Sequence, residues 1–446
     1  MSLEMKNKLI EEFSNFELAL NGQKHLGLHN IRKKAIEQFV SLGLPTTKNE
    51  EWKYTNLNFL TKHDFHLVTF LKSVNIEFKD IFPFLFKELN ENFLVFVNGI
   101  LVPELSGINL RSRRLMIGSI TEAYNKEMPI INHFTKYADV SNDSFVALNT
   151  AFVNDGAFIY VPDNATVAGP IHIIYINDTK QEAVMSQPRI LMSIGSNVDV
   201  QIIESLHTIG DKEGFINSVV EISIGSNSRV EYYKMQDDNL KSYYIGSTFI
   251  KQDRDSFLKT HTICLGGAFI RNNFEIMLDG EGAELEMGGI HYNYDNQYVE
   301  NRTMVEHRKP NCKSNQIFKG ILDDDSRAVF NGKIYVRPNA QKTSAYQSNK
   351  NILLTDRAKI NSKPQLEIYA DDVKCSHGAT SGYLDKDSMF YLKARGIEEP
   401  KAKALLLNAF ASEIIEKVDI DELRDSLKQK VALRLGVEDI YFCDVF

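Results

Sequence analysis

Hydrophobic and polar residues follow three different patterns along the chain. Up to about Asp64 the apolar residues recur with helical spacing, as in the segment from Ile31 to Val40. From about Asn92 onward, short runs of alternating apolar and polar residues are separated by Gly, Asn and Asp, which is typical of strands and turns. After Leu384 the helical spacing returns. We therefore predict three parts: an N-terminal helical region (1–90), a β core (91–385) and a C-terminal helical domain (386–446).

The β region contains internal echoes at a fixed spacing. Ser193-Ile-Gly-Ser-Asn197 recurs thirty residues later as Ser223-Ile-Gly-Ser-Asn227. The segment from Arg327 to Lys333 is echoed at the same offset by the segment from Arg357 to Lys363. A constant period is typical of a solenoid, in which each coil repeats a turn and a strand. A β-sandwich with chance similarity among its turns is the alternative, but the region is long for one sandwich. We predict a mainly β fold with a β-helix (solenoid) core.

The second helix predicted in the C-terminal domain has a wide apolar face. Pro400 suits the first turn of this helix, and apolar residues follow from Leu405 to Ile415. Helices at this position can cover the exposed strands at the end of a solenoid. Because the face is too broad to be solvated over most of the helix circumference, we also consider a docked partner protein. The candidate partner-binding residues are Leu405, Leu406, Ala409 and Phe410.

The chain is acidic and contains few cysteines. Its 446 residues include 51 Lys and Arg and 59 Asp and Glu, which gives a formal net charge of −8. Surfaces that bind nucleic acid or anionic membranes are basic, so we expect neither as a partner. The first residues show no export signal, and no apolar stretch has the roughly 18 residues of a membrane span, which favours a cytoplasmic location. Four cysteines without a CxxC pair speak against a disulfide framework and against a self-contained metal site.

Common catalytic motifs are missing from the sequence. It contains no GxxxxGK[ST] phosphate loop, no GxGxxG after a strand, no HExxH and no GxSxG. The adjacent carboxylates at 323–325 and at 371–372 alternate between opposite faces of a strand, so neither run is an automatic acid/base pair. We therefore expect no enzyme. The alternative from the enzyme class is a β-helix carbohydrate lyase or hydrolase, and most such enzymes are exported.

A cysteine and a histidine alternate in one late segment of the β region. If the run from Leu366 to His377 is extended, Cys375 and His377 share one face and lie about 6 to 7 Å apart at Cα. Thiolate and imidazole are both good ligands for iron and zinc. Structural zinc and Fe–S clusters usually take four protein ligands, so a site here would be transient or completed by another chain. The alternative is a core cysteine that packs beside a hydrogen-bonded histidine.

Several long motifs resemble the SufB/SufD family of iron–sulfur cluster assembly proteins. The motifs are Leu44–Thr55, Glu306–Leu322, Ala328–Ile334, Ala340–Thr343, Lys363–Thr380 and Phe390–Ile397. For the fold, the resemblance implies a right-handed parallel β-helix between two helical parts, in agreement with the three patterns. For the function, it implies a non-catalytic scaffold subunit that assists the assembly of nascent Fe–S clusters. Besides the scaffold and the carbohydrate-active enzyme, a third hypothesis is a purely structural partner without a ligand role. In that case Cys375 and His377 only pack.

Within the family, the run Asp372–Thr380 is similar to the SufD branch rather than to the SufB branch. SufB-like chains carry a key cysteine one strand earlier, and its counterpart here falls at about Asn349, where there is no thiol. The resemblance therefore implies a SufB-like paralogue that pairs with this chain through the late strands and supplies the thiolate. His377 is the first implied ligand and Cys375 the second. They would hold iron or a transient Fe–S cluster at the interface, with no permanently bound cofactor.

The resemblance also implies a second partner, a SufC-like ATPase of the ABC type, which docks on the C-terminal helical domain. This expectation agrees with the apolar face at Leu405 to Phe410 and with the missing phosphate loop, because ATP hydrolysis would belong to another chain. The isolated chain could form a homodimer through the strands meant for SufB. Neither the residues nor the resemblance assigns a role to Cys264, Cys312 or Cys443.

Overall fold

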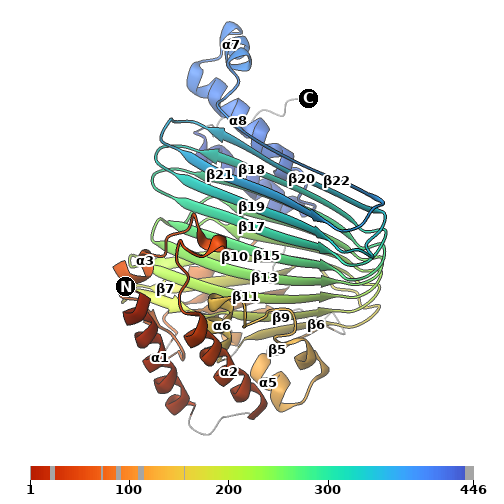
Figure 1. Cartoon of the computed structure of the whole chain (residues 1–446). Helices are drawn as coiled ribbons and strands as arrows, with labels where there is room; N and C mark the ends of the chain where they lie inside the picture. The colour runs from red at the N-terminus through yellow and green to blue at the C-terminus, as the bar shows by residue number, and fades with distance from the viewer. Residues whose placement is uncertain are drawn as a thin grey trace.

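Two sheets of stacked parallel strands form the body of the protein (Figure 1). The computed structural model describes residues 2–20, 26–71, 74–86, 92–108, 115–154 and 156–436. From residue 189 to residue 382, successive strands fall in opposite sheets, and each strand pairs in parallel with the strand two places further along the chain. This connectivity is that of a solenoid with two strands in each coil, so the predicted β-helix is confirmed.

We call the two sheets A and B and distinguish them by the helices that cover their outer faces. Sheet A, which the N-terminal helices cover, contains β5 (Met116–Ser119), β6 (Ala157–Val161), β9 (Arg189–Ile194), β11 (Gly214–Ile224), β13 (Ser242–Gln252), β15 (Phe269–Leu278), β17 (Tyr298–His307), β19 (Arg327–Val336) and β21 (Lys359–Ile368), with β1 (His66–Leu67) and β8 (Val184–Ser186) at its side. Sheet B, which the C-terminal helices cover, contains β2 (Asn92–Val97), β3 (Ile100–Leu101), β4 (Gly107–Ile108), β7 (Ile171–Thr179), β10 (Asp199–Gly210), β12 (Arg229–Gln236), β14 (Phe257–Cys264), β16 (Glu284–Asn293), β18 (Lys313–Leu322), β20 (Thr343–Leu353) and β22 (Val373–Gly382).

Asparagine turns stack along one corner of the solenoid. Asn164, Asn197 and Asn227 all have φ between 57° and 58°, in the left-handed region that Asn tolerates better than most residues. The side-chain amide of Asn227 donates to Asn197 Oδ1 at 2.7 Å, and that of Asn197 donates to Asn164 Oδ1 at 3.0 Å. The first sequence echo ends on two of these residues, and its strands are in register, with Ser193 beside Ser223. The thirty-residue period therefore corresponds here to one coil.

The second sequence echo does not correspond to the register of the strands. Arg327 lies beside Lys359, not beside Arg357, and the offset is the same along the whole of β19 and β21. Arg357 instead lies in the turn that precedes β21, where its Nε donates to Asp325 Oδ1 at 3.0 Å. The chain between the two strands is longer than the echo suggests. The similarity of the two segments thus reflects a shared turn composition and not aligned strand positions.

The N-terminal helices pack against the outer face of sheet A. Phe39 of α2 and Phe145 of α6 are buried in one cluster with Phe215, Ile245 and Phe269, which point outward from the sheet. The helical segments of this part are α1 (Ser2–Ala19), α2 (Leu26–Leu42), α3 (Phe59–Lys62), α4 (Phe78–Ile81), α5 (Ile120–Asn125) and α6 (Ser144–Ala151), with the 3-10 turns η1 (Glu50–Trp52), η2 (Phe82–Phe84), η3 (Pro103–Leu105) and η4 (Pro129–His133).

The C-terminal helices are α7 (Lys386–Ala394), α8 (Glu399–Ile415) and α9 (Asp421–Arg434). Ile414 of α8 and Leu427 of α9 are fully buried with Tyr233 and Ile263 on the outer face of sheet B. Figure 1 shows α7 beyond the last coil, at the top of the view. None of the described helices combines the length and the apolar character that a membrane span requires.

The interior of the solenoid contains a buried ion pair. Lys234 Nζ lies 3.2 Å from Glu204 Oε1, and both side chains are almost fully buried. The ammonium group also donates to the Tyr244 hydroxyl at 3.0 Å, and Tyr232 donates to Glu204. Lys234 Nζ also donates to the Thr248 hydroxyl at 3.3 Å, and apolar side chains of the core surround this group. Both charges are therefore fully desolvated and depend on each other for compensation.

We expect the substitution Glu204→Gln to destabilise the fold by about 3–5 kcal/mol, because it leaves the Lys234 ammonium buried without its counter-charge. A matched control is Glu284→Gln, which removes the partner of the exposed Lys313 and is expected to cost less than about 1 kcal/mol. Urea unfolding of both variants measures the difference. Equal losses for the two variants would show that Glu204 does not compensate a buried charge.

Candidate functional site: the open end of the solenoid

The last coil of the solenoid is open on one side. β21 ends sheet A and β22 ends sheet B, and no other strand in the described part of the chain pairs with their outer edges. Almost every residue from 373 to 382 is exposed, whereas the facing residues of earlier coils are largely buried. Two neighbouring strands of ten residues each therefore present unpaired backbone N–H and C=O groups. Such an edge is a template for pairing with another strand.

Cys375 and His377 both lie on β22, on the edge of this open coil. The run from Leu366 to His377 is not one extended strand, because the chain turns between Ile368 and Val373 and passes from sheet A to sheet B. The shared face of the two residues does not depend on that run. With a side-chain period of two, both point into the solenoid, as the packing of Cys375 with Ala345 indicates.

The two side chains differ in exposure. Cys375 is a half-buried free thiol in a small cluster with Ile334 and Ala345. Burial raises the pKa of the Cys375 thiol, and a backbone hydrogen bond at Ala345 opposes this only in part. A bound cation would be needed to favour its thiolate. His377, by contrast, is exposed at the edge.

The strand before β22 offers no thiol. Gln347 lies beside His377, and Asn349, the position counted from the sequence, lies beside Ala379. The Asn349 amide is buried, and it donates to the Phe318 carbonyl at 3.3 Å. No group of three potential metal-ligating side chains is present in the described residues. Cys375 and His377 alone fall short of the four ligands of a usual cluster or structural zinc site.

The other cysteines are far less accessible. Cys264 points into the solenoid and donates to Gln236 Oε1 at 3.0 Å, and burial raises the pKa of its thiol to about 12. Cys312 is buried in a turn, where its thiol donates to the Gly280 carbonyl at 3.2 Å and burial raises its pKa. Both therefore stay protonated at neutral pH. Cys443 lies outside the described residues.

The four residues proposed as a docking face on α8 are partly buried against the solenoid and partly exposed to solvent. Leu405 and Leu406 are half-buried and Ala409 is exposed. Phe410 already has an intramolecular partner, because Lys319 Nζ lies 4.2 Å from the centre of its ring and donates to its carbonyl at 2.8 Å. Part of the apolar face that the sequence predicted on α8 therefore packs against the solenoid.

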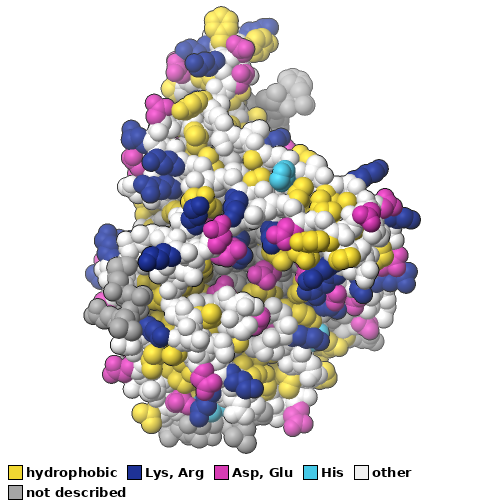
Figure 2. Space-filling view, viewed as in Figure 1, with side chains coloured by type: hydrophobic (Ala, Val, Ile, Leu, Met, Phe, Trp, Pro, Cys, Tyr) yellow, Lys and Arg dark blue, Asp and Glu magenta, His cyan; other side chains and the backbone are white. Residues whose placement is uncertain are grey.

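Aromatic side chains beyond α8 are more exposed than this face. Phe390 and Tyr391 of α7 are 74% and 57% exposed, and Tyr383, just before the helix, is 62% exposed. No residue of α7 is buried. Figure 2 shows hydrophobic side chains on the surface at this end of the molecule. Sequence reasoning missed these residues, because the spacing of aromatics on a short helix does not tell whether they face a core or the solvent.

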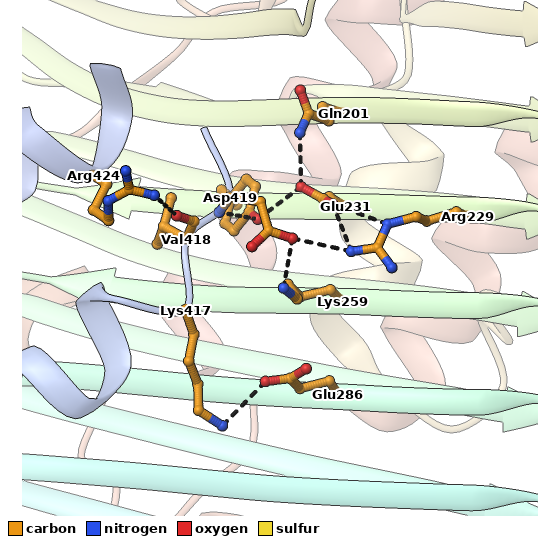
Figure 3. A network of polar contacts seen from close by, with 10 residues as sticks. Gln201, Arg229, Glu231, Lys259, Glu286, Lys417, Val418, Asp419 and Arg424 are labelled. Atoms are coloured by element: carbon orange, nitrogen blue, oxygen red, sulfur yellow. Dashed lines mark hydrogen bonds and ion pairs between the residues drawn. The ribbon is translucent and has the colours of Figure 1, made fainter. Parts of the chain in front are cut away.

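A polar network fixes the link between α8 and α9 to sheet B (Figure 3). Asp419 accepts hydrogen bonds from Lys259 Nζ at 2.6 Å and from Arg229 at 3.0 Å, and its backbone N–H donates to the Tyr233 hydroxyl at 3.1 Å. Although burial opposes it, Lys259 and Arg229 hold the pKa of the Asp419 carboxyl below its ordinary value. Lys417 adds an ion pair with Glu286 at 3.1 Å. These contacts join the link between α8 and α9 to three strands of sheet B.

Comparison with known proteins agrees with this architecture. The model described as "SUF system FeS cluster assembly, SufBD core domain" matches residues 175–410, and the SufBD protein N-terminal region matches residues 3–173. The chain is 32% identical to an iron–sulfur cluster assembly SufBD family protein of Synechocystis over 93% of both chains. It is 32% identical to the iron–sulfur cluster assembly protein SufD of Escherichia coli over 90% of both chains. SufD of Bacillus subtilis is 24% identical over 91% of this chain and 93% of its own length.

Proposed function

The chain belongs to the SufBD family of the SUF iron–sulfur cluster assembly system, and from this premise we propose that it is a non-catalytic scaffold subunit. Its open solenoid end would pair with a SufB-like paralogue, and a nascent cluster or iron would be bound transiently between them. A SufC-like ATPase would dock on the C-terminal helices. The observation that carries the proposal is the position of Cys375 and His377 on the unpaired edge of the last coil.

The incomplete ligand set supports a site shared between two chains. Cys375 and His377 are two donors, and the remaining ligands of a cluster must come from elsewhere. The exposed edge of β22 allows a second strand to add by backbone hydrogen bonds, which would bring the partner's side chains opposite His377. The cluster in this scheme is cargo that is released and not a resident cofactor. The same edge would allow two copies of the isolated chain to pair as a homodimer.

The C-terminal helices support the docking of an ATPase. The sequence has no phosphate loop, so ATP hydrolysis requires another chain. Phe390 and Tyr391 offer aromatic anchors, and Leu405, Leu406 and Ala409 continue the surface along α8. Large aromatic side chains are the residues that most often dominate a protein interface. Because Asp419 and Lys417 bind α8 and α9 to sheet B, movement of a docked ATPase would reach the solenoid directly.

We expect the double substitution Phe390→Ala and Tyr391→Ala to weaken binding of the SufC-like ATPase by about 10- to 100-fold, since aromatic anchors contribute at least about 2 kcal/mol at an interface hot spot. Titration of the purified chain with the ATPase, followed by calorimetry, measures the change. Leu433→Ala on α9, which removes an equally exposed apolar side chain, serves as the control and should bind as the wild type does. Wild-type affinity of the double variant would exclude α7 from the docking surface.

The proposed function as a whole is tested by co-purification of the chain with the SufB-like and SufC-like proteins of the same source. The complex is isolated without oxygen and analysed for iron and acid-labile sulfide. We expect a stable complex that accumulates both after incubation with an iron salt, a sulfur donor and ATP. If the chain fails to bind the SufB-like protein, or if the complex assembles clusters equally well without it, the scaffold proposal is wrong.

A further inference from the structure

A column of stacked side chains leads through the solenoid interior to His377. Gln316 on β18 lies beside Gln347 on β20, and Gln347 lies beside His377 on β22. We propose that Gln347 is a positioning residue, whose side-chain oxygen accepts a hydrogen bond from one ring N–H of His377 while the other ring nitrogen binds the metal. This inference rests on the proposed function, because it concerns the same ligand.

The Gln347 side chain is enclosed in the interior of the solenoid, beside Gly332. Its exposed fraction is 0%, so the carboxamide is inside the solenoid. A Cβ atom added to Gly332 would lie only 2.4 Å from Gln347 Nε2, so glycine at position 332 leaves the room that the amide needs. The position of the amide is therefore determined by its surroundings and not by a free choice of rotamer.

Hydrogen bonds with the preceding coil fix the direction of this amide. Gln316 Oε1 accepts from the Thr303 hydroxyl at 2.8 Å and from Gln347 Nε2 at 3.4 Å. The nitrogen of the Gln347 amide thus faces Gln316, and the amide oxygen faces away from Gln316. Gln347 Oε1 is buried and has no hydrogen-bond partner in the described residues. Buried carbonyl oxygens usually accept a hydrogen bond in native proteins, so this oxygen is available to a donor.

His377 lies directly beside Gln347 in the register of β20 and β22, on the open side of the column. Neighbouring strands lie about 4.8 Å apart, so directly paired side chains on the same face are within contact distance. Histidine ligands of metals usually donate their second ring N–H to a carbonyl or carboxylate oxygen, which fixes the tautomer and the ring orientation. Cys375 has only Ala345 beside it, and Ala345 offers no such acceptor. Gln347 would therefore select the histidine as the oriented ligand of the pair.

The test compares isosteric variants in the complete complex with the SufB-like partner. Gln347→Met removes the acceptor at similar volume, and Gln347→Glu retains an acceptor. Anaerobic equilibrium dialysis with Fe²⁺ alone measures affinity, and we expect Gln347→Met to bind about 10- to 100-fold more weakly, as for other lost partners of metal-bound histidines. Gln347→Glu is expected to bind nearly as the wild type does. Proton–nitrogen correlation spectra of the histidine-labelled full chain should show a changed tautomer ratio of His377 only in Gln347→Met.

Asn349→Leu is the matched control, since it also replaces a buried amide on β20 but lies beside Ala379. It should leave both Fe²⁺ affinity and the His377 tautomer unchanged. If His377→Ala abolishes Fe²⁺ binding while Gln347→Met leaves affinity and tautomer as in the wild type, the positioning role is refuted and the proposed function stands. If His377→Ala binds Fe²⁺ as the wild type does, the shared site itself is refuted, and the role of Gln347 with it.

Discussion

Replacing His377 with alanine is expected to abolish the production of iron–sulfur clusters by the complex while leaving its assembly intact. The side chain is exposed at the edge of the last coil, and exposed substitutions usually change the free energy of unfolding by less than about 0.5 kcal/mol. The loss would therefore arise from the missing ligand and not from misfolding. The readout is the transfer of clusters from the purified complex to an apo-ferredoxin.

Three further variants show which side chains of β22 are required for cluster production. Ser376→Ala changes an exposed side chain on the opposite face of the same strand and should leave cluster production unchanged. Cys375→Ala tests the second donor, whose raised thiol pKa makes it the weaker ligand in the absence of a cation. Normal cluster yield from the double variant of Cys375 and His377 would establish the purely structural reading of the pair.

Lowering the pH from 7 to 5 is expected to destabilise the fold by several kcal/mol. His172, His261, His291 and His307 are buried, and His207 is half-buried against Phe84. Burial lowers the pKa of His172, His207 and His261 to about 3, and that of His291 and His307 to about 4. Because these values lie below the pKa of about 6.5 in the unfolded chain, the unfolded state binds more protons. Stability is therefore complete above about pH 6.5 and falls as the pH decreases toward the folded values.

Each of these histidines contributes a slope of up to about 1.4 kcal/mol per pH unit. Urea unfolding at pH 7.5, 6.5 and 5.5 measures the sum, with the midpoint expected to drop between the last two values. His207 is a useful probe, since its ring stacks on Phe84 with 3.8 Å between the ring centroids and Lys430 also disfavours its charge. His207→Gln should reduce the slope by about one proton. A stability that does not change between pH 7.5 and 5.5 would show that these rings are accessible to protons in the folded state.

The helices and the solenoid were largely predictable because their patterns are local. Ala35 and Phe39 are fully buried on the face that the helical spacing of Ile31 to Val40 indicated, although Val40 at the end of that segment is exposed. The first echo marks one coil because Asn197 and Asn227 repeat the same left-handed turn. The second echo was misleading, since similar turns can precede strands that pair at a different offset.

The candidate site was predictable only in part. The two-residue period of a strand is enough to place Cys375 and His377 on one face. The turn between Ile368 and Val373 was missed because no Gly or Pro marks it. The exposure of Phe390 and Tyr391 was missed as well, because burial depends on neighbours that the local pattern does not contain.

The sequence by itself indicated a solenoid flanked by helices, the repeating coil, the two candidate ligands and the family resemblance, whereas the helices α5 and α6 lie inside the segment predicted as β core. Each of these inferences from the sequence follows from residue order and from periods of two, about 3.6 and about thirty residues. Only the tertiary structure decided that β21 and β22 end their sheets, that Gln347 lies beside His377 and that Asp419 joins α8 and α9 to sheet B. These are contacts between residues distant in the chain, and they depend on register, which is set by the lengths and packing of all the intervening coils.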